Sequence, residues 1–295
     1  MPAADAPPPV FVIGNPRSGT TLLRLMLTCH PNIVIPPECG FALLWYDKYG
    51  GLPGARWREP QTVQECIRDI LTSKKIEFWD LEPAALEAFI TGSHPQSYTD
   101  IVSLVYRFYG RIHGRHAKRW GDKNNYYLDH ILTIRRLFPD ALFVHIIRDV
   151  RDVACSYRDL AGAALESRYA PSLAAEPQRT AESWVRNIGC IRQQFAALGW
   201  EGVLEIRYED LVVNPKGTLE QVCRFLREDF DAAMLDYPRA NRKNLLEPEE
   251  FLAWKAKTLD PPSAAEVGKY RSELAPADIA AIEAVANPLL RLYRY

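Results

Sequence analysis

Two apolar runs without regular polar alternation stand out along the chain, at 9–14 and 141–147. Both contain β-branched residues, and such runs are typical of strands buried on both faces of a parallel sheet. Shorter strands are predicted at 118–122 and 203–207. Helical spacing predicts helices between and after the strands, at 20–29, 62–73, 83–91, 98–114, 126–137, 150–161, 174–198, 215–227, 277–286 and 288–293.

The order of these elements decides the fold class. Strands that alternate with helices indicate right-handed βαβ units. We therefore predict an α/β fold, a P-loop-like three-layer sandwich with a central parallel sheet flanked by helices. The proline-rich segment 1–9 is predicted to be a disordered lead, and 10–295 a single domain, because no repeat or low-complexity tract divides the chain. Loops and short helices are predicted at 40–60, and irregular structure at 237–268.

Composition and charge narrow the function. The 295 residues include 36 Lys and Arg against 37 Asp and Glu, a formal charge of −1. A nucleic-acid-binding protein needs a basic excess to engage phosphates, so this class is disfavoured. No run approaches about 18 uncharged apolar residues, so no membrane span is predicted. The six cysteines are scattered without a CxxC pair, which favours a reducing cytoplasm and predicts no metal site.

A strand, a loop and a helix meet at 14–21, with the sequence GNPRSGTT. This GxxxxG frame resembles a phosphate-binding loop, in which backbone N–H groups and the helix dipole attract an anion. The lysine that follows the second glycine in nucleotide kinases is Thr20 here, and the positive charge lies earlier, on Arg17. The loop is therefore predicted to hold an anion other than a magnesium-bound triphosphate. The alternative is an ordinary glycine turn.

A second basic site is predicted at Arg148, which follows the strand at 141–147, with Ser156 in the next helix. Ligands of open α/β sheets bind beyond the carboxyl ends of the strands. Kinases with a phosphate-binding loop typically place an acid here to hold magnesium. A cation favours a second phosphate instead, bound by charge and a hydroxyl without metal. The alternative is an ion pair of Arg148 with Asp149 or Asp152.

The segments PRSGTTLL at 16–23 and RDVRDVACS at 148–156 resemble motifs of the sulfotransferase family, especially its tyrosylprotein and bacterial branches. Those enzymes use 3′-phosphoadenosine 5′-phosphosulfate (PAPS) and release PAP. The resemblance implies that the first motif binds the 5′-phosphosulfate and the second the 3′-phosphate, with further family positions in YEDL and GKYRSEL. The implied donor-binding residues are Arg17, Ser18, Gly19, Thr20, Thr21, Arg148, Ser156, Tyr208 and Lys269.

Two residues are candidates for the chemistry of sulfuryl transfer, which needs a base for the acceptor proton and cations for the developing charge. Glu38 follows the helix at 20–29 through a short link stiffened by two prolines, and it resembles the catalytic glutamate of the tyrosylprotein branch. Lys123 resembles the family's transition-state lysine. The alternatives are a surface carboxylate for Glu38 and a solvated lysine for Lys123.

The predicted function is therefore metal-independent transfer of the sulfuryl group from PAPS to a hydroxyl of a phenol, sugar, lipid or peptide tyrosine. The segment 255–268 is a candidate lid over the nucleotide. Two alternatives are a P-loop nucleotide or small-molecule kinase and a catalytically silent nucleotide-binding module. Four aromatic residues are candidates for an acceptor pocket, with a core role equally open for each: Trp45, Tyr46, Tyr49 and Trp57.

Overall fold

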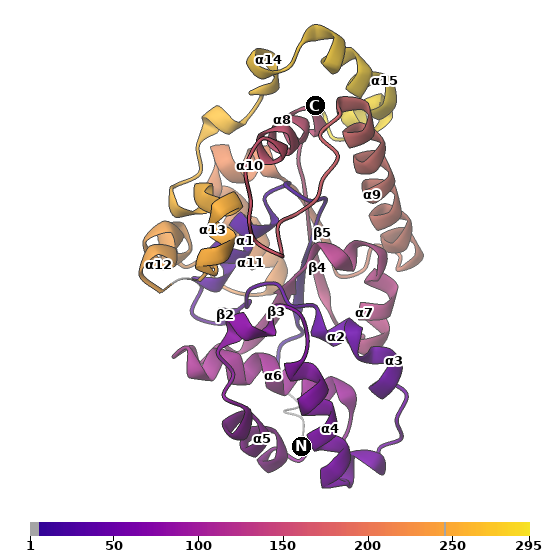
Figure 1. Ribbon diagram of the computed structural model, residues 1–295, viewed down its shortest axis with the longest axis vertical. Helices are drawn as coiled ribbons and strands as arrows, with labels where there is room; N and C mark the ends of the chain where they lie inside the picture. Colours follow the sequence, from indigo (N-terminus) through magenta and orange to yellow (C-terminus); the bar gives the residue numbers. More distant parts are fainter. Residues whose placement is uncertain (1–5, 245) are drawn as a thin grey trace.

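The computed structural model describes residues 6–244 and 246–295. Its centre is a five-stranded parallel sheet with the strand order β2-β3-β1-β4-β5 (Figure 1). The strands are β1 (Val10–Ile13), β2 (Ile33–Val34), β3 (Arg119–Lys123), β4 (Leu142–Ile147) and β5 (Val203–Arg207). The predicted parallel sheet is confirmed, and β2 is a strand that the sequence pattern did not indicate.

Side chains alternate across the sheet and build a core on each face. Val10 and Val12 of β1 belong to a cluster with α1 (Thr20–Thr28) and α11 (Pro215–Leu226), whereas Phe11 and Ile13 belong to a cluster with α6 (Tyr98–Ile112) and α9 (Pro177–Ala197). A strand buried on both faces needs such an apolar run. The predicted three-layer α/β sandwich is therefore confirmed.

Shorter elements surround this framework, with α4, α5 and α6 towards one end of the molecule and α14 and α15 at the other (Figure 1). A third buried cluster joins α8, α9 and α15 beyond the edge of the sheet. The remaining helices are α2 (Phe41–Leu44), α3 (Tyr46–Tyr49), α4 (Pro60–Leu71), α5 (Pro83–Gly92), α7 (Ile131–Leu137), α8 (Val150–Ala161), α10 (Tyr208–Val213), α12 (Tyr237–Asn244), α13 (Glu249–Lys255), α14 (Tyr270–Glu273) and α15 (Pro276–Leu292). Among the described residues, none of the helices has both the length and the apolar character needed to cross a bilayer.

Two predicted helix boundaries were wrong. The helix predicted at 126–137 is a 3₁₀ turn, Asn125–Asp129, followed by α7, because the backbone of His130 leaves the helical region at φ −124°. The break predicted at Pro288 does not occur, and α15 runs through it. Buried residues on both sides of Pro288, among them Ala286 and Leu290, pack in the third cluster and hold the helix together despite the missing N–H donor.

The prediction of irregular structure at 237–268 was also wrong in part, because α12 and α13 lie within it. The predicted lead, 1–9, differs as well. Residues 1–5 lie outside the described residues, but the carbonyl of Pro9 accepts a hydrogen bond from the N–H of Leu142 at 2.9 Å. The ordered chain therefore reaches the sheet before the predicted boundary at residue 10.

The close approach of β1 and β3 depends on Gly121. A Cβ added there would lie 2.5 Å from the carbonyl oxygen of Val10, so Gly121→Ala should lower the free energy of unfolding by about 1–3 kcal/mol through overpacking. Gly189→Ala is the matched control, because its Cβ would meet open space on an exposed face of α9 and should stabilise the helix by about 0.5–1 kcal/mol. Urea unfolding measures the free energy of unfolding of both variants. If Gly121→Ala were no less stable than Gly189→Ala, the packing argument would be contradicted.

Candidate active site

The carboxyl ends of the strands place the predicted residues along one edge of the sheet. Glu38 follows β2, Lys123 ends β3, the loop at 14–19 follows β1, Arg148 follows β4 and Tyr208 follows β5. Because the strands are parallel, all these positions lie at the same edge, where open α/β sheets bind ligands. The strand order puts Glu38 and Lys123 on one side of the loop, and Arg148 and Tyr208 on the other.

The loop is fixed by its own backbone and by two helices behind it. The N–H of Ser18 donates to the carbonyl of Asn15 at 3.1 Å, and Gly19 takes a left-handed φ of 92° at the start of α1. Asn15 accepts a hydrogen bond from Asn187 of α9 and donates one to Tyr157 of α8. The sequence reading missed this anchoring role of Asn15, which a fully buried polar residue next to a glycine fulfils.

Arg17 and Arg148 meet across the loop. The Arg17 Nε donates to Ser156 Oγ at 3.0 Å, and Arg148 Nη1 donates to the main-chain carbonyl of Arg17 at 3.3 Å. Burial, and next the charge of Arg148, lower the pKa of Arg17. The Arg17 guanidinium donates to the hydroxyl of Ser156 and to the main-chain carbonyl of Trp254. Ser156 therefore lies against the first basic motif, and the two motifs form one cationic region.

Two buried polar atoms in this region have no hydrogen-bond partner, Ser18 Oγ and Arg148 Nε. Buried polar atoms are nearly always paired in folded proteins. Thr20 is buried and Thr21 half-buried in the first turn of α1, where N–H groups and the helix dipole favour an anion. These observations fit the phosphate and sulfuryl oxygens of a donor such as PAPS.

The environment of Arg148 excludes the alternative ion pairs. Asp149 binds Arg151 at 2.7 Å, and Asp152 accepts hydrogen bonds from the N–H groups of Gly268 and Tyr270. The Arg148 guanidinium instead lies 4.3 Å from the centre of the Tyr208 ring and donates to the main-chain carbonyl of Glu266. Asp149 and Asp152 are thus structural, and the carboxylate of Glu266 stays 3.9 Å from Arg148.

The two residues of the YEDL segment that bear on the site have separate structural roles. The ring of Tyr208 packs so closely on Gly19 that a Cβ there would lie 2.4 Å from it. Glu209 accepts a hydrogen bond from the N–H of Asp149 at 3.0 Å and so fixes the chain directly after Arg148. Tyr208 therefore joins the loop to the second basic motif.

Lys269 lies at the border of the site with its charge already shared. Its ammonium is 3.1 Å from Asp159, 3.5 Å from Glu273 and 3.9 Å from Glu266. Burial opposes the charge, but the hydrogen bond with Asp159 raises the pKa of Lys269. The structure brings Lys269 close to the acid that approaches Arg148, without directing its ammonium at the loop.

Glu38 and Lys123 form a buried ion pair, so both alternatives from the sequence were wrong. Lys123 donates to Glu38 Oε1, and Lys75 lies 3.0 Å from Glu38 Oε2. Burial alone would raise the pKa of Glu38, but the charges of Lys123, Lys255 and Lys75 hold it well below its usual value. Burial lowers the pKa of Lys123 to about 8 although Glu38 opposes the shift.

A second buried ion network adjoins this pair and was missed from the sequence. Arg24 of α1 lies 2.5 Å from Glu247, which also accepts a hydrogen bond from Lys255 of α13. Arg24 and Glu247 are each 1% exposed. A lone arginine within the apolar helix TTLLRLMLT was the available signal; Lys75 and Lys255 carried none that distinguishes them from surface lysines.

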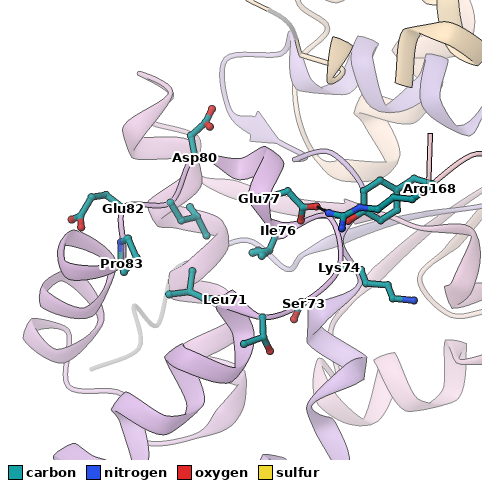
Figure 2. Close-up of a pocket in the computed structure, with 12 residues that line it drawn as sticks. Leu71, Ser73, Lys74, Ile76, Glu77, Asp80, Glu82, Pro83 and Arg168 are labelled. Atoms are coloured by element: carbon teal, nitrogen blue, oxygen red, sulfur yellow. Dashed lines mark hydrogen bonds and ion pairs between the residues drawn. The ribbon is translucent and has the colours of Figure 1, made fainter. Parts of the chain in front are cut away.

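A pocket of about 640 Å³ lies beside the segment that carries Lys75, with Lys74 and Ile76 in its wall. It is bounded by the end of α4, the start of α5 and the residues Arg168 and Tyr169. Figure 2 shows the carboxylate of Glu77 turned towards Arg168, and the two are 2.6 Å apart. Of the candidate acceptor aromatics, Trp45 donates a hydrogen bond at 2.9 Å to Ser73, which lines this pocket. Tyr49 and Trp57 are instead buried in the core beside Tyr98. Tyr49 and Trp57 are therefore core residues, which is one of the two roles that the sequence left open for them.

Comparisons with known proteins identify the family of this chain. The model of the sulfotransferase family matches residues 8–232. The chain belongs to the sulfotransferase family. The matched range includes the loop, Glu38, Lys123, Arg148, Ser156 and Tyr208, and it ends before α13 and Lys269.

Individual family members give the same fold. The sulfotransferase domain of the Synechococcus PCC 7002 olefin synthase is 25% identical, covers 95% of this chain and 94% of its own, and superposes with a TM-score of 0.59. A mouse sulfotransferase solved in complex with PAP is 14% identical, with a TM-score of 0.50 over 96% of this chain and 84% of its own. Protein-tyrosine sulfotransferase 2 of Gallus gallus is 26% identical over 78% of this chain and 54% of its own length. The chain spans about half the length of the first curated relatives that it matches.

Removal of the Glu38 charge should destabilise the fold, because buried Lys123 and partly buried Lys75 lose their anionic partner. Glu38→Gln should lower the free energy of unfolding by about 3 kcal/mol near neutral pH, because Lys123 loses its carboxylate partner. The lowered pKa of Glu38 stabilises the fold above the ordinary glutamate pKa, about 4.3, and this stability is lost as the pH falls through the lower folded value. The difference from wild type, measured by urea unfolding, should therefore narrow in acid. Glu201→Gln, at an exposed position, is the control, and a difference independent of pH would contradict the ion pair.

Proposed function

We propose that this chain transfers the sulfuryl group of PAPS to a hydroxyl of an acceptor. The observation that carries the proposal is one sheet edge that holds a cationic loop region and a buried glutamate–lysine pair side by side. Arg17 and Arg148 lie in contact there, and Glu38 is bound to Lys123 at the end of β3, the strand next to β1. Family membership and the PAP complex of the mouse structure support the choice of donor.

In this proposal the donor binds along the loop. The backbone of Ser18 and Gly19 and the hydroxyls of Thr20 and Thr21 hold the phosphosulfate end, and Arg17 neutralises it. Arg148 holds the 3′-phosphate with the ring of Tyr208 as its support. Ser156 orients Arg17 through their 3.0 Å hydrogen bond, and Lys269 contributes charge at the border. PAPS supplies an activated sulfuryl group, and lysine and arginine charges take the place of a metal ion.

The acid–base work falls to Glu38. The carboxylate accepts the proton of the acceptor hydroxyl while the oxygen attacks sulfur; the bond from sulfur to the 5′-phosphate oxygen breaks, and PAP keeps that electron pair. Before the donor binds, Lys123 and Lys75 occupy both oxygens of Glu38. Donor oxygens compete for Lys123, and a weaker lysine contact raises the pKa of Glu38 and makes it the better base. Lys123 thus moves its charge from the base to the reacting group.

The acceptor class remains a hydroxyl compound in this proposal. The chicken relative is named for protein tyrosine, and this chain spans only about half of that protein. The kinase alternative is not favoured, because Thr20 replaces the loop lysine and Arg148 follows β4 in place of a magnesium-binding acid. A family model that covers 8–232 supports the sulfotransferase reading instead.

Donor binding tests the proposal directly. PAP should raise the melting temperature of the protein, because the site has two phosphate-binding regions. Mg-ATP should not, because Arg148 follows β4 where kinases place a magnesium-binding acid. Arg148→Ala should weaken PAP binding by about 2–4 kcal/mol, the scale of a lost charged hydrogen bond in a buried site. Isothermal titration calorimetry measures the affinity, and exposed Lys243→Ala is the control. Stabilisation by Mg-ATP alone, or an unchanged affinity of R148A, would overturn the assignment.

The alkaline side of the pH profile should report Lys123. Because the pKa of Lys123 is lowered to about 8, kcat/KM for PAPS should fall as the pH rises through that value and the ammonium loses its charge. Lys123→Arg keeps its charge, since the pKa of arginine exceeds about 12, so the alkaline fall should disappear even where the absolute rate is lower. Lys243→Arg should retain the wild-type profile. Persistence of the fall in K123R would remove Lys123 from this role.

A further inference from the structure

Lys255 ends the short helix α13, beyond the range that the family model matches. Its side chain is only 9% exposed, and its ammonium donates to Glu247. The same ammonium lies 4.9 Å from the centre of the Phe251 ring, and the ammonium of Lys75 lies 5.2 Å from that ring centre. Since Lys75 binds Glu38, Phe251 places Lys255 next to the catalytic ion pair.

The charges around Phe251 do not balance. Glu38 is shared by Lys123 and Lys75, and Glu247 is shared by Arg24 and Lys255, so four cations face two carboxylates. Lys123 and Arg24 are each 1% exposed, and their partners are 12% exposed or less. Surplus buried cations are unfavourable unless an anion joins them. The excess of positive charge over these two carboxylates therefore indicates a place for an anionic group.

The helix that carries Lys255 is attached to the phosphate-binding loop. Arg17 Nη1 donates to the main-chain carbonyl of Trp254 at 3.0 Å, directly before Lys255 in the chain. Lys255 thus comes from a segment that covers the loop, and it lies on the Glu38 side of Arg17. Glu247, its partner, is already bound by Arg24 at 2.5 Å, so this acid keeps a cation when Lys255 turns to another oxygen.

We propose that Lys255 is a further catalytic residue, whose ammonium binds the oxygens of the transferring sulfuryl group opposite Lys123. The inference rests on the proposed function and extends it to a residue outside the matched motifs. The charge on these oxygens and on the bridging oxygen changes as the sulfur–oxygen bond to PAP breaks and the bond to the acceptor forms. A fixed cation at that point stabilises the transition state more than the bound donor. PAP has no sulfuryl group, so Lys255 contributes little to PAP binding.

The test compares Lys255→Met with Lys255→Arg and with Lys243→Met, an exposed control on α12. Lys255→Met should lower kcat about 100-fold, the scale of a lost charge-stabilising donor, and weaken PAPS binding. Its affinity for PAP should change by less than about threefold, and Lys255→Arg should recover part of the rate because it keeps the charge. Stopped-time transfer assays give kcat, calorimetry gives the affinities, and thermal unfolding verifies that each variant is folded. Lys243→Met should behave as wild type.

Each other outcome overturns the inference. Unchanged kcat in Lys255→Met means that the residue only completes the network with Glu247. If the affinities for PAP and PAPS fall by the same factor, Lys255 acts on the phosphates that both share or on the packing of α13 over the loop, and not on the sulfuryl group. If Lys255→Met does not fold, Lys255→Arg decides, since an unaltered kcat and pH profile with the bulkier cation would contradict contact with sulfuryl oxygens. Failure of the wild type to bind PAP or PAPS would instead refute the proposed function itself.

Discussion

The buried cations at one edge of the sheet need anionic partners, and this electrostatic requirement governs the arrangement around them. Glu38 and Glu247 each serve two basic side chains, and Arg17 and Arg148 rely largely on main-chain carbonyls. A carbonyl dipole compensates a buried guanidinium only in part. The protein therefore holds excess positive charge in a buried region, and this condition makes the binding of an anionic substrate favourable.

The topology explains how residues far apart in sequence supply one charge cluster. Parallel strands end at a common edge, and the direction of the connections changes between β1 and β4, the neighbours that carry the loop and Arg148. The helix α13 then returns over the loop and adds its own lysine. Charge is thus collected from the strand ends below and from a covering segment above, so that both sides of a ligand meet cations.

Residues in and beside the two basic motifs also hold the structure of the site. Tyr208 fills the space that the missing side chain of Gly19 leaves and supports Arg148 by its ring face. Glu209 fixes the backbone behind Arg148, and Asp152 ties the Gly268–Tyr270 segment to α8. These contacts hold the two basic motifs at a fixed separation, so little conformational freedom is lost on ligand binding, and affinity benefits from preorganisation.

The sequence by itself determined four of the five strands, the loop and the candidate residues at the strand ends, because apolar periodicity and glycine positions act locally. It also indicated Glu38 and Lys123, but not that each is the other's partner. Only the tertiary structure decided the pairing of Lys75 and Lys255 with this centre, the continuity of α15 through Pro288 and the core role of Trp57. The reason is that long-range packing sets the burial of a charge and the support of a helix. A lysine in solvent and a lysine in a buried cluster share the same local pattern.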